Sequence, residues 1–117
     1  MNPKLLGAMG EQEAARYLRK NGYDILSSNI FIGSGELDIV AIKDSILCFV
    51  EVKTRRYGGM FSPSEAVGFE KRENLKSAAS VYMSKYNMNY DFRFDIVEVL
   101  VDDEFNVTSV NHIENAF

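Results

Sequence analysis

Two short segments that read as β-strands carry charged residues among isoleucine, valine and phenylalanine. Residues 35–40 are Gly-Glu-Leu-Asp-Ile-Val, and residues 49–53 are Phe-Val-Glu-Val-Lys. Burying a charge between apolar neighbours is costly unless the charge is paired or binds a metal ion. These segments therefore predict two neighbouring strands whose charged side chains serve a function.

The segment Lys-Asp-Ser-Ile at residues 43–46 predicts the turn of an antiparallel hairpin. A turn centred there places Asp38 opposite Glu51 and Glu36 opposite Lys53. Side chains two positions apart share a face, so all four would form one cluster. Directly opposed like charges repel, which predicts a cation between Asp38 and Glu51. Glu36 and Lys53 could instead form a plain ion pair.

Residues 4–21 have the pattern of an amphipathic helix, with Gly22 as its stop signal. Glu11 is the one charged residue on the small, apolar stripe of this helix. The stripe also holds Gly7, Ala14, Ala15 and Leu18. A glutamate on the side that faces the core is expected to meet a cation or a cleft. The alternative is a rotated helix that leaves Glu11 half exposed.

The rest of the chain predicts an edge strand, a second long helix and two further strands. Ser62, Pro63 and Glu65 indicate a capped start of that helix, with an interruption near Gly68. The expected ranges are 23–30 for the edge strand, 62–86 for the helix, and 91–101 and 107–113 for the last strands. The order α-β-β-β-α-β-β predicts an α/β (α+β) fold, with one mixed sheet flanked by helices. A length of 117 residues fits a single domain over 1–117.

Basic residues follow the predicted cluster along the chain. Residues 54–60 read as a basic, glycine-rich loop in which Arg55 and Arg56 either contact phosphates or are solvated. Lys71, on the second helix, either reaches a phosphate or extends its ammonium group to solvent. His112, the single histidine, shows no partner in the sequence and is expected at a surface or a sheet edge.

Composition bears on the compartment and the partners. The chain has no apolar run long enough to span a membrane and no signal-peptide pattern at its start. Its single cysteine, Cys48, cannot form an internal disulfide, so a reducing cytoplasm is expected. The net charge of −4 argues against non-specific binding of nucleic acid. An acidic metal site weakens that argument, because bound cations would offset its charge.

Converging carboxylates suit a hard divalent cation. Mg²⁺ prefers oxygen ligands and keeps several waters, and it can activate water for attack on a phosphodiester. Lys53 follows Glu51 by two residues and would share its face, where it could position the water or stabilise a developing anion. Asp38, Glu51 and Lys53, together with Glu11, therefore indicate a phosphodiesterase site.

Motifs spread over nearly the whole chain resemble the YraN family of small bacterial predicted endonucleases. They are Gly10-Glu11, Asn29, residues 35–40 and 49–55, Lys71, residues 93–95 and the closing residues 115–117. That family is similar to archaeal Holliday-junction resolvases and to the PD-(D/E)xK nucleases of restriction-endonuclease-like fold. The resemblance implies an α-β-β-β-α-β core, metal-binding acids at Asp38 and Glu51, the motif lysine at Lys53 and the first-helix glutamate at Glu11. Leu37 stands where the superfamily signature has proline.

We therefore expect a Mg²⁺- or Mn²⁺-dependent endonuclease that acts on DNA, with branched DNA as one candidate substrate. The expected site comprises the catalytic residues Glu11, Asp38, Glu51 and Lys53, the metal ligands Asp38, Glu51 and Glu11, and the nucleic-acid contacts Arg55, Arg56 and Lys71. One alternative is a non-catalytic nucleic-acid-binding module within a DNA-processing assembly. Another is a structural protein whose charges only form cross-strand pairs. A homodimer would suit symmetric cuts at a junction, and the sequence leaves the oligomeric state open.

Overall fold

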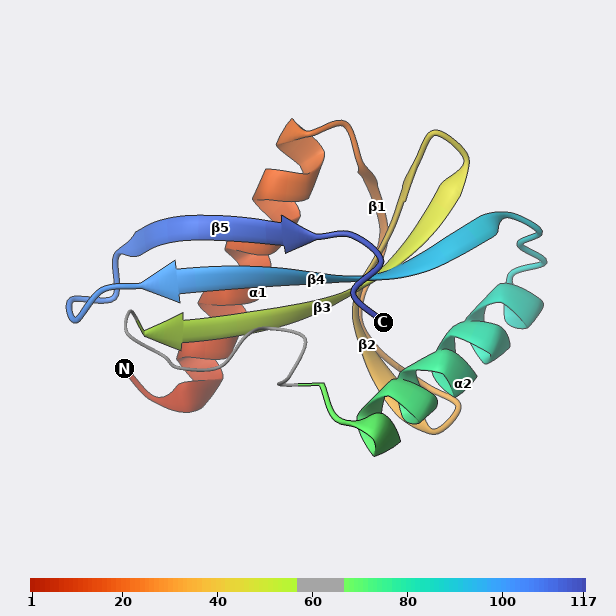
Figure 1. Cartoon of the computed structure of the whole chain (residues 1–117), viewed down its shortest axis with the longest axis horizontal. Helices are drawn as coiled ribbons and strands as arrows, with labels where there is room; N and C mark the ends of the chain where they lie inside the picture. The colour runs from red at the N-terminus through yellow and green to blue at the C-terminus, as the bar shows by residue number, and fades with distance from the viewer. Residues whose placement is uncertain (57–66) are drawn as a thin grey trace.

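A computed structural model describes residues 1–56 and 67–117 of the chain. The elements follow the predicted order of helix, three strands, helix and two strands (Figure 1). Their bounds are α1 Pro3–Lys20, β1 Asp24–Ile32, β2 Gly35–Lys43, β3 Ile46–Arg56, α2 Phe69–Lys85, β4 Asp91–Val101 and β5 Val107–Ile113. Neither helix is long and apolar enough within these residues to cross a membrane.

The five strands form one mixed sheet in the order β1-β2-β3-β4-β5. Neighbouring strands run antiparallel, with the exception of β3 and β4, which are parallel. A parallel pair needs a crossover connection, and the segment that carries α2 provides it. This arrangement confirms the predicted α/β fold and the edge position of the first strand.

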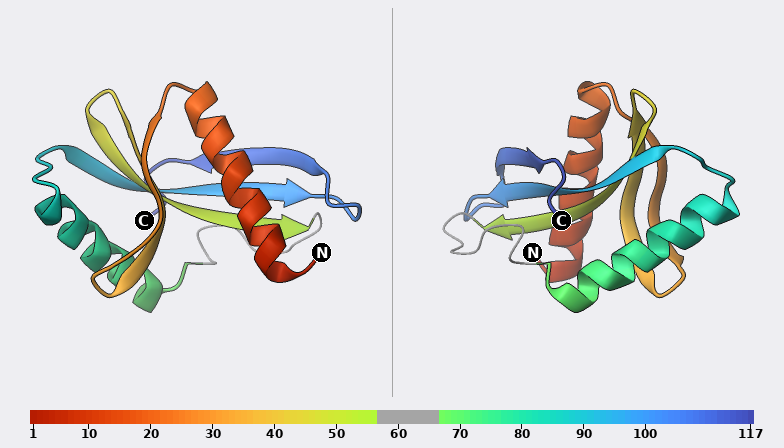
Figure 2. Two further views of the ribbon diagram at one scale, coloured as in Figure 1. Left: turned by 180° about the vertical axis from the view of Figure 1, so that it is seen from behind. Right: turned by 45° about the vertical axis from the view of Figure 1, so that its right-hand side comes forward.

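The two helices lie on opposite faces of the sheet. Phe49 belongs to the core cluster beneath α2, whereas the next residue, Val50, belongs to the cluster beneath α1. Successive residues of a strand point to opposite faces, so β3 separates two cores. Seen from behind, α1 crosses β3, β4 and β5, while α2 packs against β2 and β1 (Figures 1 and 2).

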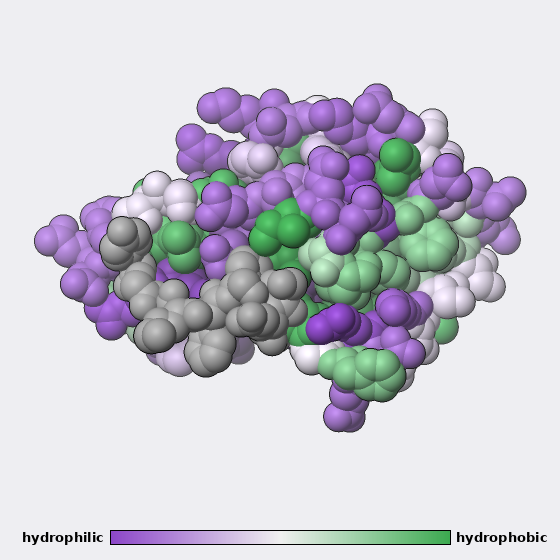
Figure 3. Space-filling view, viewed as in Figure 1, coloured by the Kyte–Doolittle hydropathy of each residue, from purple (hydrophilic) through white to green (hydrophobic). Residues whose placement is uncertain are grey.

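The outer surface mixes apolar and polar side chains. In the space-filling view, apolar residues gather right of centre, near the C-terminal end of the chain, and polar residues cover the upper edge (Figure 3). The last residue, Phe117, packs on the α2-side core, where its ring lies 5.2 Å from the ring of Phe94. The end of the chain thus helps to cover that core.

Local signals fix the position of α1. The side chain of Asn2 accepts a hydrogen bond from the Leu5 N–H at 2.9 Å, which caps the first turn. Gly22, with φ of +88°, follows the end of the helix. In between, α1 touches β3 at Gly10, where an added Cβ would lie 1.7 Å from Thr54 Oγ1. The predicted buried stripe is confirmed for Ala14, Ala15 and Leu18, although Gly10 rather than Gly7 is its buried glycine. This close approach holds α1 directly against the sheet.

The predicted hairpin register between β2 and β3 is confirmed near the turn. Asp44 and Ser45 both have positive φ, as a two-residue hairpin turn requires, and the pairs run from Lys43–Ile46 to Ile39–Val50. The pairing stops there. Beyond Ile39 and Val50, β2 continues alongside β1, and β3 continues alongside β4. We call this divergence of β2 from β3 the fork.

The fork makes part of the predicted register wrong. Glu36 does not pair with Lys53, because β2 has already left β3 at that point. Residues 54–56 were also expected in a loop, but they extend β3 because the parallel neighbour β4 pairs with them as far as Arg56–Val101. The rest of that loop and the capping segment 62–65 lie outside the described residues. The second helix, α2, begins at Phe69 with Gly68 as its N-cap.

Candidate functional site

The fork places the side chain of Asp38 between the separating strands. Asp38 Oδ2 accepts a hydrogen bond from the Val52 N–H at 2.9 Å, so a carboxylate replaces the carbonyl that a continuing strand would offer. This bond ties β2 to β3 one step beyond their last backbone pair, Ile39–Val50. Asp38 is therefore held in a fixed place next to the strand segment that carries Glu51.

Glu51 is the most buried acid of this site and receives two lysines. Its side chain is only 5% exposed, and its Oε1 lies 2.7 Å from Lys71 Nζ and 3.6 Å from Lys53 Nζ. Lys71 reaches it from the first turns of α2, and Lys53 follows it by two residues on β3. We call Asp38, Glu51, Lys53 and Lys71 the Asp38 cluster. Sequence reasoning placed Lys71 near a phosphate and missed its ion pair with Glu51.

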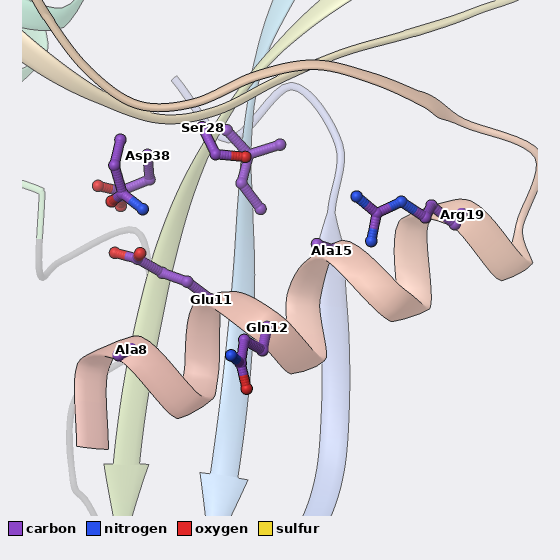
Figure 4. Close-up of a pocket in the computed structure, with 9 residues that line it drawn as sticks. Ala8, Glu11, Gln12, Ala15, Arg19, Ser28 and Asp38 are labelled. Atoms are coloured by element: carbon purple, nitrogen blue, oxygen red, sulfur yellow. The ribbon is translucent and has the colours of Figure 1, made fainter. Parts of the chain in front are cut away.

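Glu11 approaches the cluster from the other face of the sheet. Its carboxylate extends from α1 toward Asp38, and both residues line one pocket (Figure 4). A second pocket, of about 210 Å³, is lined by Asp38, Glu51 and Lys71 on the α2 side. Asp38 thus lies between two pockets. The predicted convergence holds for Asp38, Glu51 and Lys53, with Glu11 alongside Asp38 and partly exposed.

Electrostatics sets Asp38 apart from the other acids of the site. Burial, followed by the neighbouring charge of Glu51, raises the pKa of Asp38 to about 7. The charge of Glu11 adds to this effect, while the hydrogen bond from Val52 opposes it. A carboxyl group with a raised pKa is stabilised by protonation or by a nearby cation.

The two lysines respond in opposite ways. Burial and the charge of Lys71 lower the pKa of Lys53. Burial also acts to lower the pKa of Lys71, but its hydrogen bond to Glu51 and the Glu51 charge outweigh burial and raise it. Glu51 is therefore neutralised chiefly by Lys71, which leaves Lys53 as the lysine that gives up its proton more readily.

The donor set fits a divalent cation held by two carboxylates. Within residues 1–56 and 67–117, no group of three or more His, Cys, Asp or Glu side chains is assembled closely enough to hold a metal. Mg²⁺ commonly takes only one or two carboxylates and keeps its waters, which Asp38 and Glu51 could provide for. The ammonium group of Lys71 already places positive charge against Glu51 Oε1. Asp38 and Glu51 thus form an acid pair with Glu11 beside Asp38 and Lys71 against Glu51.

The predicted phosphate-binding arginines lie farther along β3. Arg55 Nε is 3.9 Å from a carboxylate oxygen of Glu98. Arg56 is 2.9 Å from Asp103 Oδ1, and its guanidinium lies 5.4 Å from the centre of the Phe105 ring. Both contacts are within the chain, and a role in phosphate binding stays a prediction for each arginine.

A second set of buried charges was missed by sequence reasoning. Asp95 is fully buried, and its carboxylate accepts hydrogen bonds from Arg93 Nε at 3.0 and 3.1 Å and from the Asn115 N–H at 3.1 Å. His112 lies on the edge strand β5, as expected, but its Nε2 is 2.7 Å from Asp95 Oδ2, a partner that the sequence did not indicate. Arg93 also donates to the Tyr23 hydroxyl. We call these five residues the Asp95 cluster. The alternation of Arg93, Phe94 and Asp95 was its only sequence signal.

Comparison with known proteins finds relatives in sequence over nearly the full length of the chain. The sequence model of the uncharacterised protein family UPF0102 matches residues 10–99. A UPF0102 protein of Syntrophomonas wolfei is 48% identical, with 96% of each chain covered. UPF0102 proteins of Caldanaerobacter subterraneus and Alkaliphilus metalliredigens are 44% and 43% identical, covering 100% and 97% of this chain and 98% of each relative. The chain therefore belongs to the UPF0102 family.

Proposed function

We propose that this UPF0102 protein is a metal-dependent endonuclease of the PD-(D/E)xK type, related to the YraN group, that hydrolyses phosphodiester bonds in DNA. The observation that carries the proposal is the Asp38 cluster at the fork. Two carboxylates meet there with a lysine two residues beyond one of them, and the pKa of Asp38 is raised by burial and by the charge of Glu51. Acids whose pKa is raised by burial together with a neighbouring charge gather at active sites.

Asp38 and Glu51 would hold the Mg²⁺ or Mn²⁺ ion, with Glu11 next to Asp38. When bound, such an ion lowers the pKa of a coordinated water and stabilises negative charge on a phosphodiester. Lys53 lies on the same face as Glu51, and its lowered pKa suits a residue that accepts or positions a proton. Lys71 would leave Glu51 for a phosphate oxygen once a metal ion neutralises that carboxylate.

A second function is favoured by one contact. Because Lys71 already neutralises Glu51 without a metal, the same site could serve a non-catalytic nucleic-acid-binding module. The two functions differ in turnover. A binding module would retain DNA in Mg²⁺ without cutting it, and the loss of Lys71 would weaken binding in the presence and in the absence of metal alike.

A cleavage assay tests the proposal directly. The purified protein is incubated with duplex, single-stranded, flap and four-way DNA in Mg²⁺, Mn²⁺, Ca²⁺ or EDTA. We expect cleavage of at least one substrate in Mg²⁺ or Mn²⁺, and its loss in Asp38→Asn and Glu51→Gln. Glu13→Gln is the matched control, because Glu13 pairs with Arg16 on α1 and does not line the pockets at Asp38. Intact DNA under every condition would refute the nuclease function.

The proposed partners and location follow from the same function. Symmetric cuts at a four-way junction would require two copies of the site, so we propose a homodimer on branched DNA. Analytical ultracentrifugation with and without a four-way junction tests this, and a monomer on the junction would contradict it. A cytoplasmic location is proposed because Cys48 is a buried, free thiol.

A further inference from the structure

We propose that the pocket between α1 and β1 binds the nucleotide next to the scissile phosphate, with Arg19 holding its phosphate and Asn29 contacting its base or sugar. This inference rests on the proposed nuclease function and names a binding subsite for its substrate. We call the cavity the α1–β1 pocket. It is lined by Ala8, Glu11, Gln12, Ala15, Arg19, Ser28, Asn29, Asp38 and Ile39 (Figure 4).

The place of the pocket relative to Asp38 is the first support. Asp38 lines the α1–β1 pocket on one side and the pocket with Glu51 and Lys71 on the other. A DNA strand that is cut at Asp38 and Glu51 must extend beyond these two residues in at least one direction. The α1–β1 pocket, at about 350 Å³, lies within the range of cavities that hold small molecules. The pocket is therefore large enough for the nucleotide next to the scissile phosphate.

The charges along the pocket are the second support. Glu11 and Asp38 lie at one end, and Arg19 comes from the last turns of α1, where its side chain extends back along the helix toward Ala15 (Figure 4). Eight residues of helix separate Glu11 from Arg19, or about 12 Å along the axis. Among the residues that the structure describes, no ion pair involves Arg19. Its guanidinium is thus available for the bidentate contact that arginine makes with phosphate.

The backbone of β1 is the third support. Asn29 has φ of +50° within a strand, and the pairing of β1 with β2 skips from Ser28–Ile39 to Ile30–Leu37, directly opposite Asp38. Successive side chains of a regular strand point to opposite faces, but Ser28 and Asn29 both line this pocket. The distortion therefore brings two residues with hydrogen-bonding side chains to one cavity. Residues held at unusual backbone angles gather at functional sites, and Asn tolerates this one at little cost.

The mixture of polar side chains indicates the class of ligand. A carboxamide, a hydroxyl and a guanidinium beside an acid pair suit a nucleotide, which has both a phosphate and hydrogen-bonding edges. An apolar ligand would leave these groups without partners, which is costly in a buried complex. A nucleotide within a DNA strand and a free nucleotide share this chemistry, and the experiment separates them.

The test compares two arginines on the same helix. Arg19→Ala removes the proposed phosphate contact, whereas Arg16→Ala removes an equal charge from an 80% exposed side chain that pairs with Glu13 and does not line the pocket. Binding of a single-stranded oligonucleotide is measured in Ca²⁺ by fluorescence anisotropy at several salt concentrations. We expect Arg19→Ala to weaken binding at least fivefold more than Arg16→Ala and to lower the log–log salt slope by about 0.7. Equal losses for both variants would overturn the proposal.

Asn29→Gly removes the carboxamide and keeps a residue that adopts positive φ. We expect it to weaken binding without changing the salt slope, and an unchanged affinity would remove Asn29 from the subsite.

Amide NMR shifts locate the ligand with two probes, the 5′-phosphorylated thymidine dinucleotide and thymidine monophosphate. Shifts at Ser28 and Asn29 with the dinucleotide, and weaker ones with the mononucleotide, support a subsite for a DNA strand. Equal or stronger shifts with the mononucleotide would indicate a free-nucleotide site and overturn it.

The outcomes also separate this inference from the proposed function. Cleavage of DNA without any shift at Ser28 or Asn29 would leave the nuclease standing and refute the subsite. Shifts in the pocket of a protein that cleaves no substrate would support the subsite and refute the nuclease. A single-stranded oligonucleotide that does not bind at all would refute the subsite, and the cleavage assay would still decide the nuclease function.

Discussion

Two buried acids in this protein have very different surroundings. Asp95 is fully buried and accepts hydrogen bonds from Arg93 and from a backbone N–H, with His112 against its other side. Within residues 1–56 and 67–117, Asp38 accepts one hydrogen bond, from the Val52 N–H, and it faces Glu51 and Glu11, whose charges oppose its own. Each set contains two basic side chains, but the Asp95 cluster has one carboxylic acid and the Asp38 cluster has two. They differ in whether the carboxylate is surrounded by donors or by other acids.

The comparison shows how a fold can separate structural from reactive charge. In the Asp95 cluster the groups that contact Asp95 come from β4, β5 and the residues after β5, and Tyr23, which precedes β1, contacts Arg93. In the Asp38 cluster the strands diverge, pockets open on both sides, and the acid remains short of positive charge. Stability should therefore depend on the first cluster, and any chemistry on the second.

The largest effect is expected when the Asp95 cluster loses its acid. Asp95→Ala leaves Arg93 and the Asn115 N–H without their acceptor in a buried place. We expect the free energy of unfolding to fall by about 3–5 kcal/mol, measured by urea denaturation. Asp91→Ala, at the exposed start of the same strand, is the control and should change it by less than about 0.5 kcal/mol. If Asp95→Ala lowers the free energy of unfolding by less than about 1 kcal/mol, the Asp95 cluster does not stabilise the fold as expected.

Loss of Lys53 from the Asp38 cluster should lower the cleavage rate and change stability little. Lys53→Met keeps most of the side-chain bulk and removes the charge. If Lys53 stabilises the transition state, cleavage should fall a hundredfold or more, on the order of 3 kcal/mol. DNA affinity in Ca²⁺ should stay within twofold. Lys76→Met, half exposed on α2 and paired with Glu73, is the control. A Lys53→Met protein that cleaves normally but unfolds more easily would make Lys53 a structural partner of Glu51.

Protonation of Asp38 should make the stability of the protein depend on pH. Because the pKa of Asp38 is raised from 3.8 to about 7, the native state binds its proton more tightly than the unfolded chain does. The metal-free protein should therefore lose stability as the pH rises from about 4 to about 7, by up to about 1.4 kcal/mol per pH unit. Asp38→Asn keeps a carbonyl acceptor for Val52 and should flatten this slope in urea denaturation. If stability falls as steeply with pH in Asp38→Asn, the pH dependence comes from other groups.

The smallest effect is expected at the outer end of β3. Arg56→Ala breaks an exposed ion pair with Asp103, which should cost no more than about 1 kcal/mol of stability. If Arg56 contacts a duplex phosphate, the log–log salt slope of DNA binding should fall by about 0.9. Asp103→Ala is the matched control, because it breaks the same pair and keeps the arginine. An unchanged slope in Arg56→Ala would exclude Arg56 from the interface.

Local signals made most of the fold predictable. The turn at residues 43–46 fixed the register of β2 and β3, and Gly22 marked the end of α1. The predicted meeting of Asp38 with Glu51 followed from that register. The fork was not predictable, because it depends on β1 and β4 competing for the two strands. The pair Lys71–Glu51 was missed because it joins α2 to β3, and the pair His112–Asp95 because it depends on the register of β4 and β5, which was not predicted.

The hydrogen bond across the fork also gives the protein a spectroscopic reporter. The Val52 N–H donates to a side chain that can take up a proton, whereas its neighbours on β3 belong to a regular ladder. A change of charge on Asp38, by protonation or by a bound cation, alters the acceptor of one identifiable amide. The nitrogen and proton frequencies of Val52 should therefore follow the occupancy of the site in the intact, isotope-labelled protein, with no substrate and no attached probe.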